Sequence, residues 1–161
     1  MSLTHYNHDI IAWANEQARY IRNKQFDLLD LEHIAEEIED VGKSEQRELA
    51  SRIVVLLCHL LKWYYKPNKR SISWFTTIAN QRDDLTDLLK DNPGLKQYLP
   101  ELLKKSYRNA RREAAAETGL VLSNFPDQCP YSLPQILDPG FLCNTTSDFK
   151  YAMDQDTANE E

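Results

Sequence analysis

Apolar residues recur every three or four positions along most of this chain, which is the spacing of one face of an α-helix. The pattern predicts four long helices, at about residues 8–24, 31–65, 71–90 and 95–118. Short polar links separate them, so we expect an all-α fold, an up-and-down four-helix bundle. The second helix would be roughly 50 Å long if straight, and Gly42 within it predicts a bend or a break.

The same periodicity predicts which residues face inward. In the first helix the inward stripe is Ile10, Ala14, Gln17, Ala18 and Ile21, flanked by Trp13. In the second helix one stripe runs along the whole length: Ile34, Ile38, Val41, Leu49, Ile53, Leu56, Leu60 and Trp63. Asp30 is the expected N-cap of this helix, and Ser71 or Ser73 that of the third.

Beyond Gly119, four prolines interrupt the helical pattern, but apolar residues such as Phe125 and Ile136 stand between them. We therefore expect this irregular C-terminal segment to pack on the bundle. The predicted organisation is a single helical-bundle domain over residues 1–143, followed by a disordered acidic tail over residues 144–161.

Composition and charge narrow the functional classes. The net charge of −6 disfavours general affinity for nucleic acid, although a local basic patch is compatible with it. The longest apolar run, residues 53–61, is too short to span a bilayer. The first residues do not form a signal peptide, and the cysteines are scattered without a Cys-x-x-Cys pair. These features predict a cytoplasmic protein with no membrane association.

Several segments together match one known family. They are Leu31–Gly42 (LEHIAEEIEDVG), His59–Trp63 (HLLKW), Ser73–Trp74, Gln81–Arg82, Tyr107–Arg111 (YRNAR), Glu117–Leu120 (ETGL) and Phe125–Tyr131 (FPDQCPY). In this order, and from about Tyr6 to Leu142, the chain resembles the bacterial family called domain of unknown function 29 (DUF29), which is abundant in cyanobacteria. The resemblance implies a small cytoplasmic helical protein and assigns no catalytic residue or cofactor.

The candidate site is a row of polar residues on the most apolar helix. Glu45, Arg52 and His59 are spaced seven apart, so they share one helical face beside an inward-packing segment. Arg82 on the third helix and Glu113 and Glu117 on the fourth also belong to apolar faces. We expect these six residues to meet inside the bundle. They would form either a titrating polar pocket or a buried salt-bridge network that fixes helix register.

Two specific chemistries are alternatives for this cluster. Arg52 and His59 loosely resemble the Arg-x(4–6)-His signature of HEPN ribonucleases, with the basic residues Lys104, Lys105, Arg108, Arg111 and Arg112 to hold RNA phosphates. His59 with Glu45, Glu113 or Glu117 would be a mixed nitrogen and oxygen metal site. The Glu-x-x-His pattern of di-iron bundles does not occur, and its nearest relative is Asp30-x-x-His33.

The absence of a recognisable catalytic motif favours a non-enzymatic function without a cofactor. We expect a helical-bundle protein that mediates macromolecular interaction or self-association, with a protein partner or a second copy of the chain. The features behind this are the acidic run within residues 32–40 and an aromatic cluster around residues 63–75. Nucleic acid is the weaker partner hypothesis.

Overall fold

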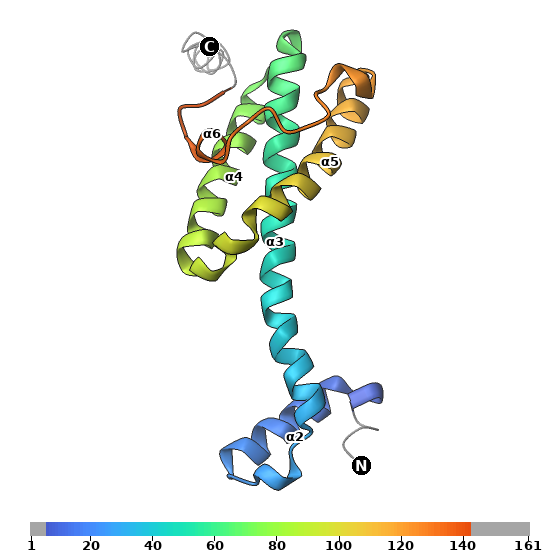
Figure 1. The fold of residues 1–161 in the computed structure, drawn as a ribbon, viewed down its shortest axis with the longest axis vertical. Helices are drawn as coiled ribbons and strands as arrows, with labels where there is room; N and C mark the ends of the chain where they lie inside the picture. Colours follow the sequence, from blue (N-terminus) through green and yellow to red (C-terminus); the bar gives the residue numbers. More distant parts are fainter. Residues whose placement is uncertain (1–5, 143–161) are drawn as a thin grey trace, which may run out of the picture. The chain divides into compact units, whose positions relative to one another are not determined.

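The computed structural model describes residues 6–142, and no β-strand occurs among them. The long helices are α2 (Ile10–Arg22), α3 (Leu31–Tyr65), α4 (Ile72–Asp91) and α5 (Leu99–Thr118), followed by the short α6 (Leu133–Leu137; Figure 1). Short 3-10 turns join them: η1 (Phe26–Leu28), η2 (Pro67–Lys69), η3 (Pro93–Tyr98) and η4 (Leu122–Asn124). The all-α prediction is confirmed. The predicted acidic tail, residues 144–161, lies outside the described residues.

Local sequence signals set the helix ends. Asp30 Oδ1 accepts from the backbone N–H of His33 at the start of α3, and Ser71 Oγ accepts from that of Trp74 at the start of α4. Both satisfy amide groups that the first helical turn leaves without an intrahelical partner. At the end of α5, Gly119 has φ 71°, a left-handed conformation that glycine adopts at little cost. These caps were all predicted from the sequence.

The helix α3 is continuous from Leu31 to Tyr65, so the chain does not break at Gly42. By contacts between residues, however, the chain divides into two compact units. We call residues 1–45 the N-terminal unit and residues 46–161 the C-terminal unit. Two units thus lie within the stretch for which the sequence predicts a single domain.

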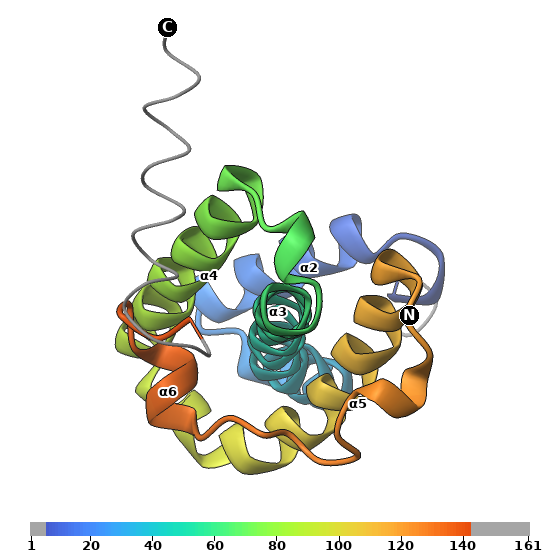
Figure 2. The same cartoon turned by 90° about the horizontal axis from the view of Figure 1, so that it is seen from above.

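The C-terminal unit contains the large hydrophobic core. The part of α3 in this unit lies between α4 and α5, and the segment after α5 returns to α4, where α6 packs (Figure 2). Leu49, Leu56, Leu60 and Trp63 of the predicted α3 stripe are completely buried there. The returning segment adds Phe125, Tyr131, Ile136 and Leu142 to the core, as its apolar residues predicted.

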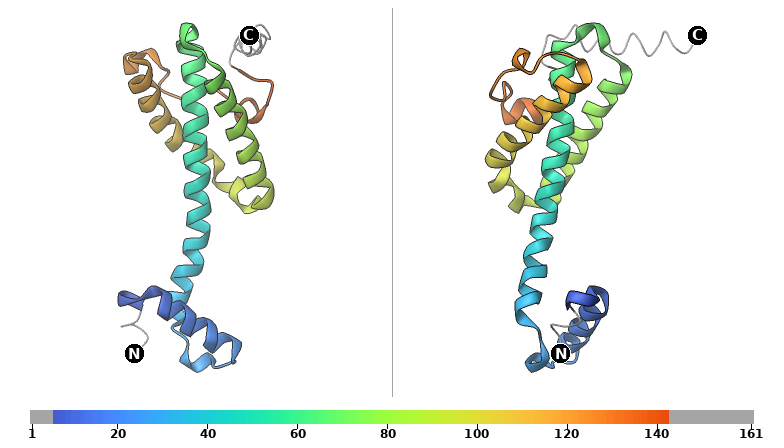
Figure 3. Two further views of the ribbon diagram at one scale, coloured as in Figure 1. Left: turned by 180° about the vertical axis from the view of Figure 1, so that it is seen from behind. Right: turned by 90° about the vertical axis from the view of Figure 1, so that its right-hand side faces the viewer.

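The N-terminal unit differs, because its helices bury few apolar side chains. It consists of α2, η1 and the first turns of α3 (Figure 3). Trp13, predicted to flank the α2 stripe, is buried, whereas Ile10 and Ile21 within that stripe are each 47% exposed. On α3, Ile38 is 68% and Val41 66% exposed. The predicted inward stripes are therefore only partly right for this unit: Gln17 of the α2 stripe is buried and contacts the start of α3 together with Trp13, whereas Ile10, Ile21, Ile38 and Val41 are exposed.

Candidate functional site

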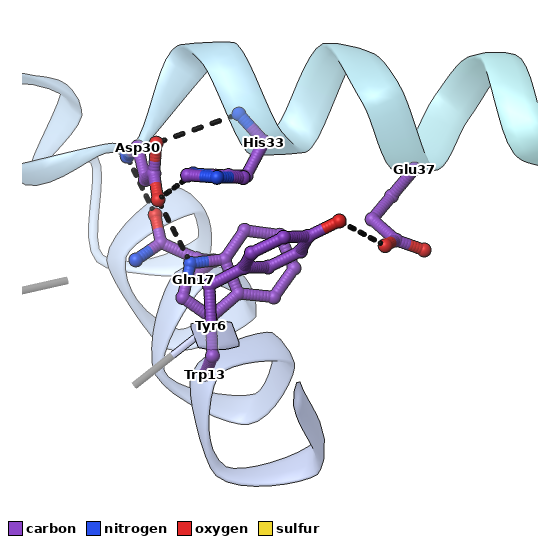
Figure 4. Close-up of polar contacts among 6 residues, drawn as sticks. All are labelled: Tyr6, Trp13, Gln17, Asp30, His33 and Glu37. Carbon is purple, nitrogen blue, oxygen red and sulfur yellow. Dashed lines mark hydrogen bonds and ion pairs between the residues drawn. The ribbon is translucent and has the colours of Figure 1, made fainter. Parts of the chain in front are cut away.

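A hydrogen-bonded cluster around the Asp30 carboxylate fastens α2 to α3 in the N-terminal unit (Figure 4). Asp30 Oδ2 accepts from Trp13 Nε1 at 3.1 Å and from His33 Nδ1 at 2.7 Å. The backbone N–H of Asp30 donates to Gln17 Oε1 at 2.8 Å. Since Trp13 and Gln17 lie one helical turn apart, both reach the same point at the start of α3.

The environment of Asp30 favours its charged form. Burial raises the pKa of this carboxyl, but the hydrogen bonds from His33 and Trp13 outweigh burial and hold the pKa below its usual value. The negative charge also lies at the N-terminus of α3, where the helix dipole stabilises it. Gln17 Nε2 is buried with no hydrogen-bond partner in the described part of the chain. Its lost hydration therefore lowers the stability of the contact between α2 and α3.

Tyr6 covers this cluster. Its ring stacks on the His33 ring, with centroids 3.8 Å apart, and meets the Trp13 ring edge to face at 4.9 Å. Its hydroxyl donates to Glu37 Oε1 at 3.0 Å. This hydrogen bond, with smaller effects of burial and nearby carboxylates, raises the pKa of Tyr6 to about 12. Tyr6 is therefore a neutral hydrogen-bond donor at physiological pH.

A carboxylate that orients an imidazole is also a common arrangement in proton transfer. Here the His33 side chain is only 13% exposed, because the Tyr6 ring stacks on it and the Trp13 ring lies beside it, with centroids 6.3 Å apart. A substrate would have little access to its ring. The geometry therefore fits a structural role, in which the cluster joins α2 to α3 by polar and aromatic contacts. Most aliphatic side chains of the unit take no part in this contact.

The C-terminal unit has a second polar cluster, centred on the buried Lys62. The Lys62 ammonium forms an ion pair with Glu117 of α5 and lies 4.6 Å from the ring centroid of Trp74 on α4. Lys62 therefore joins α3 to both neighbouring helices. Because the Glu117 side chain is half exposed, the pair opens to solvent on its acidic side.

His59 lies close enough to Lys62 and Glu117 for their charges to act on its imidazole. Its Nδ1 is 2.8 Å from the carbonyl oxygen of Val55, so Nδ1 carries the proton and Nε2 is the acceptor. Burial lowers the pKa of His59, and Lys62 adds to that; the Val55 hydrogen bond, Glu117 and Glu113 oppose it. Burial prevails, which favours neutral imidazole at pH 7.

Comparison with known protein families identifies a match that covers most of the chain. The family model described as domain of unknown function DUF29 matches residues 5–142. The chain belongs to this family. No curated protein and no solved structure matches the chain. Membership of DUF29 confirms the resemblance expected from the sequence.

The structure brings only part of the predicted six-residue cluster together. His59 lies close enough to Glu113 and Glu117 for their charges to act on it. Arg52 instead pairs with Glu48 at 3.0 Å on its own helix and with Asp84 on α4 at 2.7 Å.

Arg82 has other partners, and Glu45 belongs to the other unit. Buried Arg82 donates to the backbone carbonyls of Ile136 and Phe141, at 2.8 and 2.5 Å, and so holds the returning segment against α4. Glu45 is partly buried and is the last residue of the N-terminal unit.

The predicted basic cluster contributes to a surface pocket. Lys104, Arg108 and Arg111 of this DUF29 chain line a cavity of about 480 Å³, beside Asp127 and Cys129. Arg111 pairs with Asp127 at 3.0 Å, so part of the positive charge is compensated within the pocket. The described residues hold no group of three or more His, Cys, Asp and Glu side chains arranged for a metal ion.

Sequence reasoning missed the central residues of both clusters. Asp30 was expected only as a helix cap, and His33 only as part of a spacing relative of a metal motif. The signal that could have found this cluster was Trp13. Its indole N–H is a donor that needs an acceptor when the ring is buried, and Trp13 flanks the predicted stripe of α2. Lys62 was also missed, although a lysine between Leu61 and Trp63 in an apolar run indicates a buried ammonium that needs a partner.

Proposed function

We propose that this protein is a non-enzymatic interaction protein whose N-terminal unit provides the binding surface. The observation that carries the proposal is that this unit buries polar side chains and exposes apolar ones, the reverse of an ordinary globular domain. Among residues 6–45, the buried side chains are Trp13, Gln17 and Asp30. Eight large apolar side chains of the same stretch are between 46% and 71% exposed: Ile10, Ile11, Ile21, Phe26, Leu28, Leu31, Ile38 and Val41. We call these eight residues the apolar set.

Such exposure needs a physical reason. Single exposed apolar residues are ordinary, but a concentration of them in one small unit is typical of a binding surface. The C-terminal unit, which is more than twice as long, exposes four large apolar side chains among its described residues: Tyr64, Tyr98, Val121 and Leu122. The polar fastening around Asp30 supports the proposal, since it orders the two helices without using the aliphatic residues.

None of the helices described is both long enough and apolar enough to cross a membrane. We propose a protein surface as the partner of the apolar set, because contiguous exposed apolar residues are typical of protein–protein contacts. The proposed location is the cytoplasm, as the sequence composition indicates, and the family resemblance implies a bacterial source.

A photo-crosslinking amino acid tests the proposal in living cells. Placed at Ile38, it should give discrete covalent products with other polypeptide chains. The matched control is the same amino acid at Asp83, an exposed position on α4 of the C-terminal unit. Absence of products at Ile38, or the same products from both positions, would contradict the assignment of the binding surface to the N-terminal unit.

The ribonuclease and metal hypotheses stay predictions that rank behind this one. In the structure the Arg52 guanidinium is engaged by two carboxylates, and Glu113 and Glu117 add negative charge near His59. Both features disfavour an RNA phosphate at this place. Incubation of total RNA with wild-type protein and with Arg52→Ala and His59→Ala variants tests the first hypothesis, and elemental analysis of the purified protein tests the second.

A further inference from the structure

The surface pocket beside α5 is positively charged in a chain whose net charge is −6. We propose that this pocket binds the phosphate group of a small organic phosphate monoester. Three properties support this ligand: the volume of the pocket, the placement of three cations in it, and the charge that they leave uncompensated. The pocket belongs to the C-terminal unit, so the binding surface proposed for the N-terminal unit does not enter into it.

The pocket has two walls and a volume of about 480 Å³, which is in the usual range for small-molecule sites. One wall is a face of α5 and the other is part of the segment that follows this helix. The lining residues are Leu103, Lys104, Arg108 and Arg111 on α5, and Asp127, Gln128 and Cys129 after it. Contacts from α5 hold the second wall in place. The Tyr107 hydroxyl donates to the carbonyl oxygen of Pro126 at 2.5 Å, and Arg111 Nη2 donates to that of Phe125 at 3.0 Å.

The three cations of the pocket lie on one side of α5. Lys104, Arg108 and Arg111 are spaced four and then three residues apart, so at about 100° per residue they fall within about 60° of one another. Arg111 is partly buried and its guanidinium is fixed by hydrogen bonds, whereas Lys104 and Arg108 are exposed. A fixed guanidinium beside two adaptable cations can contact several oxygens of one phosphate group.

The positive charge of the pocket is not balanced by the protein. Asp127 is the one carboxylate among the lining residues described, and it pairs with Arg111 at 3.0 Å. Within residues 6–142, no ion pair includes Lys104 or Arg108. The stretch 104–112 holds five basic residues and no acidic one, so the neighbouring turns of α5 supply no compensation either. Two positive charges of the pocket therefore have no partner in the described part of the chain.

The uncompensated charge selects the class of ligand. A phosphate monoester carries about −1.5 to −2 charges at pH 7, which matches two cations, whereas a carboxylate, a sulfate ester or a phosphodiester carries one negative charge. Burial raises the pKa of the Cys129 thiol, so its sulfur is neutral at pH 7 and does not repel an anion. Leu103 and Cys129 also give the pocket an apolar side for the organic part of the ester. The pocket therefore fits a small phosphate ester better than the singly charged phosphates of a nucleic-acid backbone.

Phenyl phosphate is the probe for the test, and phenyl sulfate matches it in shape with one negative charge less. Isothermal titration calorimetry of the full chain at about pH 7.5, above the second pKa of the phosphate, should show saturable binding of phenyl phosphate at one site. Phenyl sulfate should bind at least about fivefold more weakly, because it lacks the second charge. Inorganic phosphate should also bind at least about fivefold more weakly, because it lacks the apolar part.

Neutral variants assign the binding to this pocket. Lys104→Gln and Arg108→Gln should each raise the Kd for phenyl phosphate by about 5–10-fold, since each removes one charge that has no other partner. The matched controls are Lys105→Gln and Arg112→Gln, which remove the same charge from exposed positions of α5 that do not line this pocket. The controls should change the Kd by less than about twofold, because solvent screens exposed charges at a distance. Circular dichroism establishes that every variant is folded.

Asp127→Asn should have the opposite effect on phenyl phosphate binding. The substitution removes the one carboxylate of the pocket and keeps the size of the side chain, so the Kd should fall by about 2–5-fold. The Asp127 side chain is 93% exposed, so folding should not depend on it. Unchanged or weaker binding by this variant would contradict a site that is limited by its own negative charge.

Four results would overturn the phosphate pocket. They are the absence of saturable phenyl phosphate binding, equal binding of phenyl sulfate, equal binding of inorganic phosphate, and control variants that lose as much affinity as Lys104→Gln and Arg108→Gln. A short single-stranded RNA that binds where phenyl phosphate does not, and that is lost in the same two variants, would assign these residues to a nucleic-acid surface instead. None of these results bears on crosslinking at Ile38, so the proposed function stands or fails separately.

Discussion

The two halves of α3 share one apolar periodicity, but the apolar side chains are exposed in the first half and buried in the second. Ile38 and Leu56 are 18 residues apart, which is five helical turns, so they occupy the same angular position on the helix. Leu56 is fully buried in the C-terminal unit, whereas Ile38 is 68% exposed in the N-terminal unit. An apolar stripe therefore predicts that a helix has a face to cover, but it does not predict what covers that face.

The two units also use buried polar groups differently. In the C-terminal unit, Arg82 and Lys62 lie at the edges of an extensive apolar core. In the N-terminal unit, Asp30 and Gln17 are themselves a large part of the interior. Stability in the first case comes mainly from apolar area, and in the second mainly from hydrogen bonds and stacked rings.

The largest expected effect separates these two sources of stability directly. Leu56→Ala should lower the free energy of unfolding by about 2–5 kcal/mol, because it leaves a cavity in the core. Ile38→Ala, at the same helical angle, should change it by less than about 0.5 kcal/mol in dilute protein. Urea denaturation followed by circular dichroism measures both. Equal losses would mean that the exposed stripe is covered within one chain.

The next effect concerns the returning segment, residues 119–142. Arg82→Met removes the donors to the carbonyls of Ile136 and Phe141, which should cost about 1–3 kcal/mol and expose the segment to proteases. Arg52→Met is the matched control: its ion pairs are partly exposed and should contribute at most about 1 kcal/mol. Limited proteolysis and thermal unfolding together test this. Equal protease resistance of the two variants would contradict the role of Arg82.

Much of the fold followed from the sequence because local chemistry decides it. Helix caps at Asp30, Ser71 and Gly119 depend on a few neighbouring residues, and so do the turns that contain proline. The core of the C-terminal unit followed too, because its stripes are long and strongly apolar. Leu49 and Trp63 are fully buried, as that periodicity predicts.

The candidate site was less predictable, because it depends on which elements meet. Helical spacing places Arg52 and His59 on one face, but it does not show that Asp84 of α4 lies within reach of the arginine. It also gives no sign that backbone carbonyls far along the chain take up the Arg82 donors. Long-range partners of this kind are fixed by tertiary packing, which a single sequence does not encode in any local pattern.

A smaller effect tests the polar fastening of the N-terminal unit. Asp30→Asn should loosen α2 and cost about 1 kcal/mol, since the amide keeps the helix cap but loses charged hydrogen bonds. Because the folded pKa of Asp30 is lowered, its contribution is complete above the usual carboxyl pKa and is lost as pH falls through the folded value. The indole N–H resonance of Trp13 reports this acid transition. The transition should be absent in Asp30→Asn and unchanged in Asp27→Asn, an exposed control.

The smallest effect concerns His59 in the C-terminal unit. Its pKa is lowered in the folded chain, chiefly by burial, so the unfolded state binds more protons between that value and the usual histidine pKa. Stability should therefore rise with pH across this window and level off above about pH 6.5. His59→Gln should flatten that part of the curve, by far less than the loss expected for Leu56→Ala. Thermal unfolding between about pH 5 and 8 measures it. An unchanged slope would mean that Glu113 and Glu117 offset the burial of the imidazole, and the polar cluster would then be closer to a titrating site than to a passive part of the core.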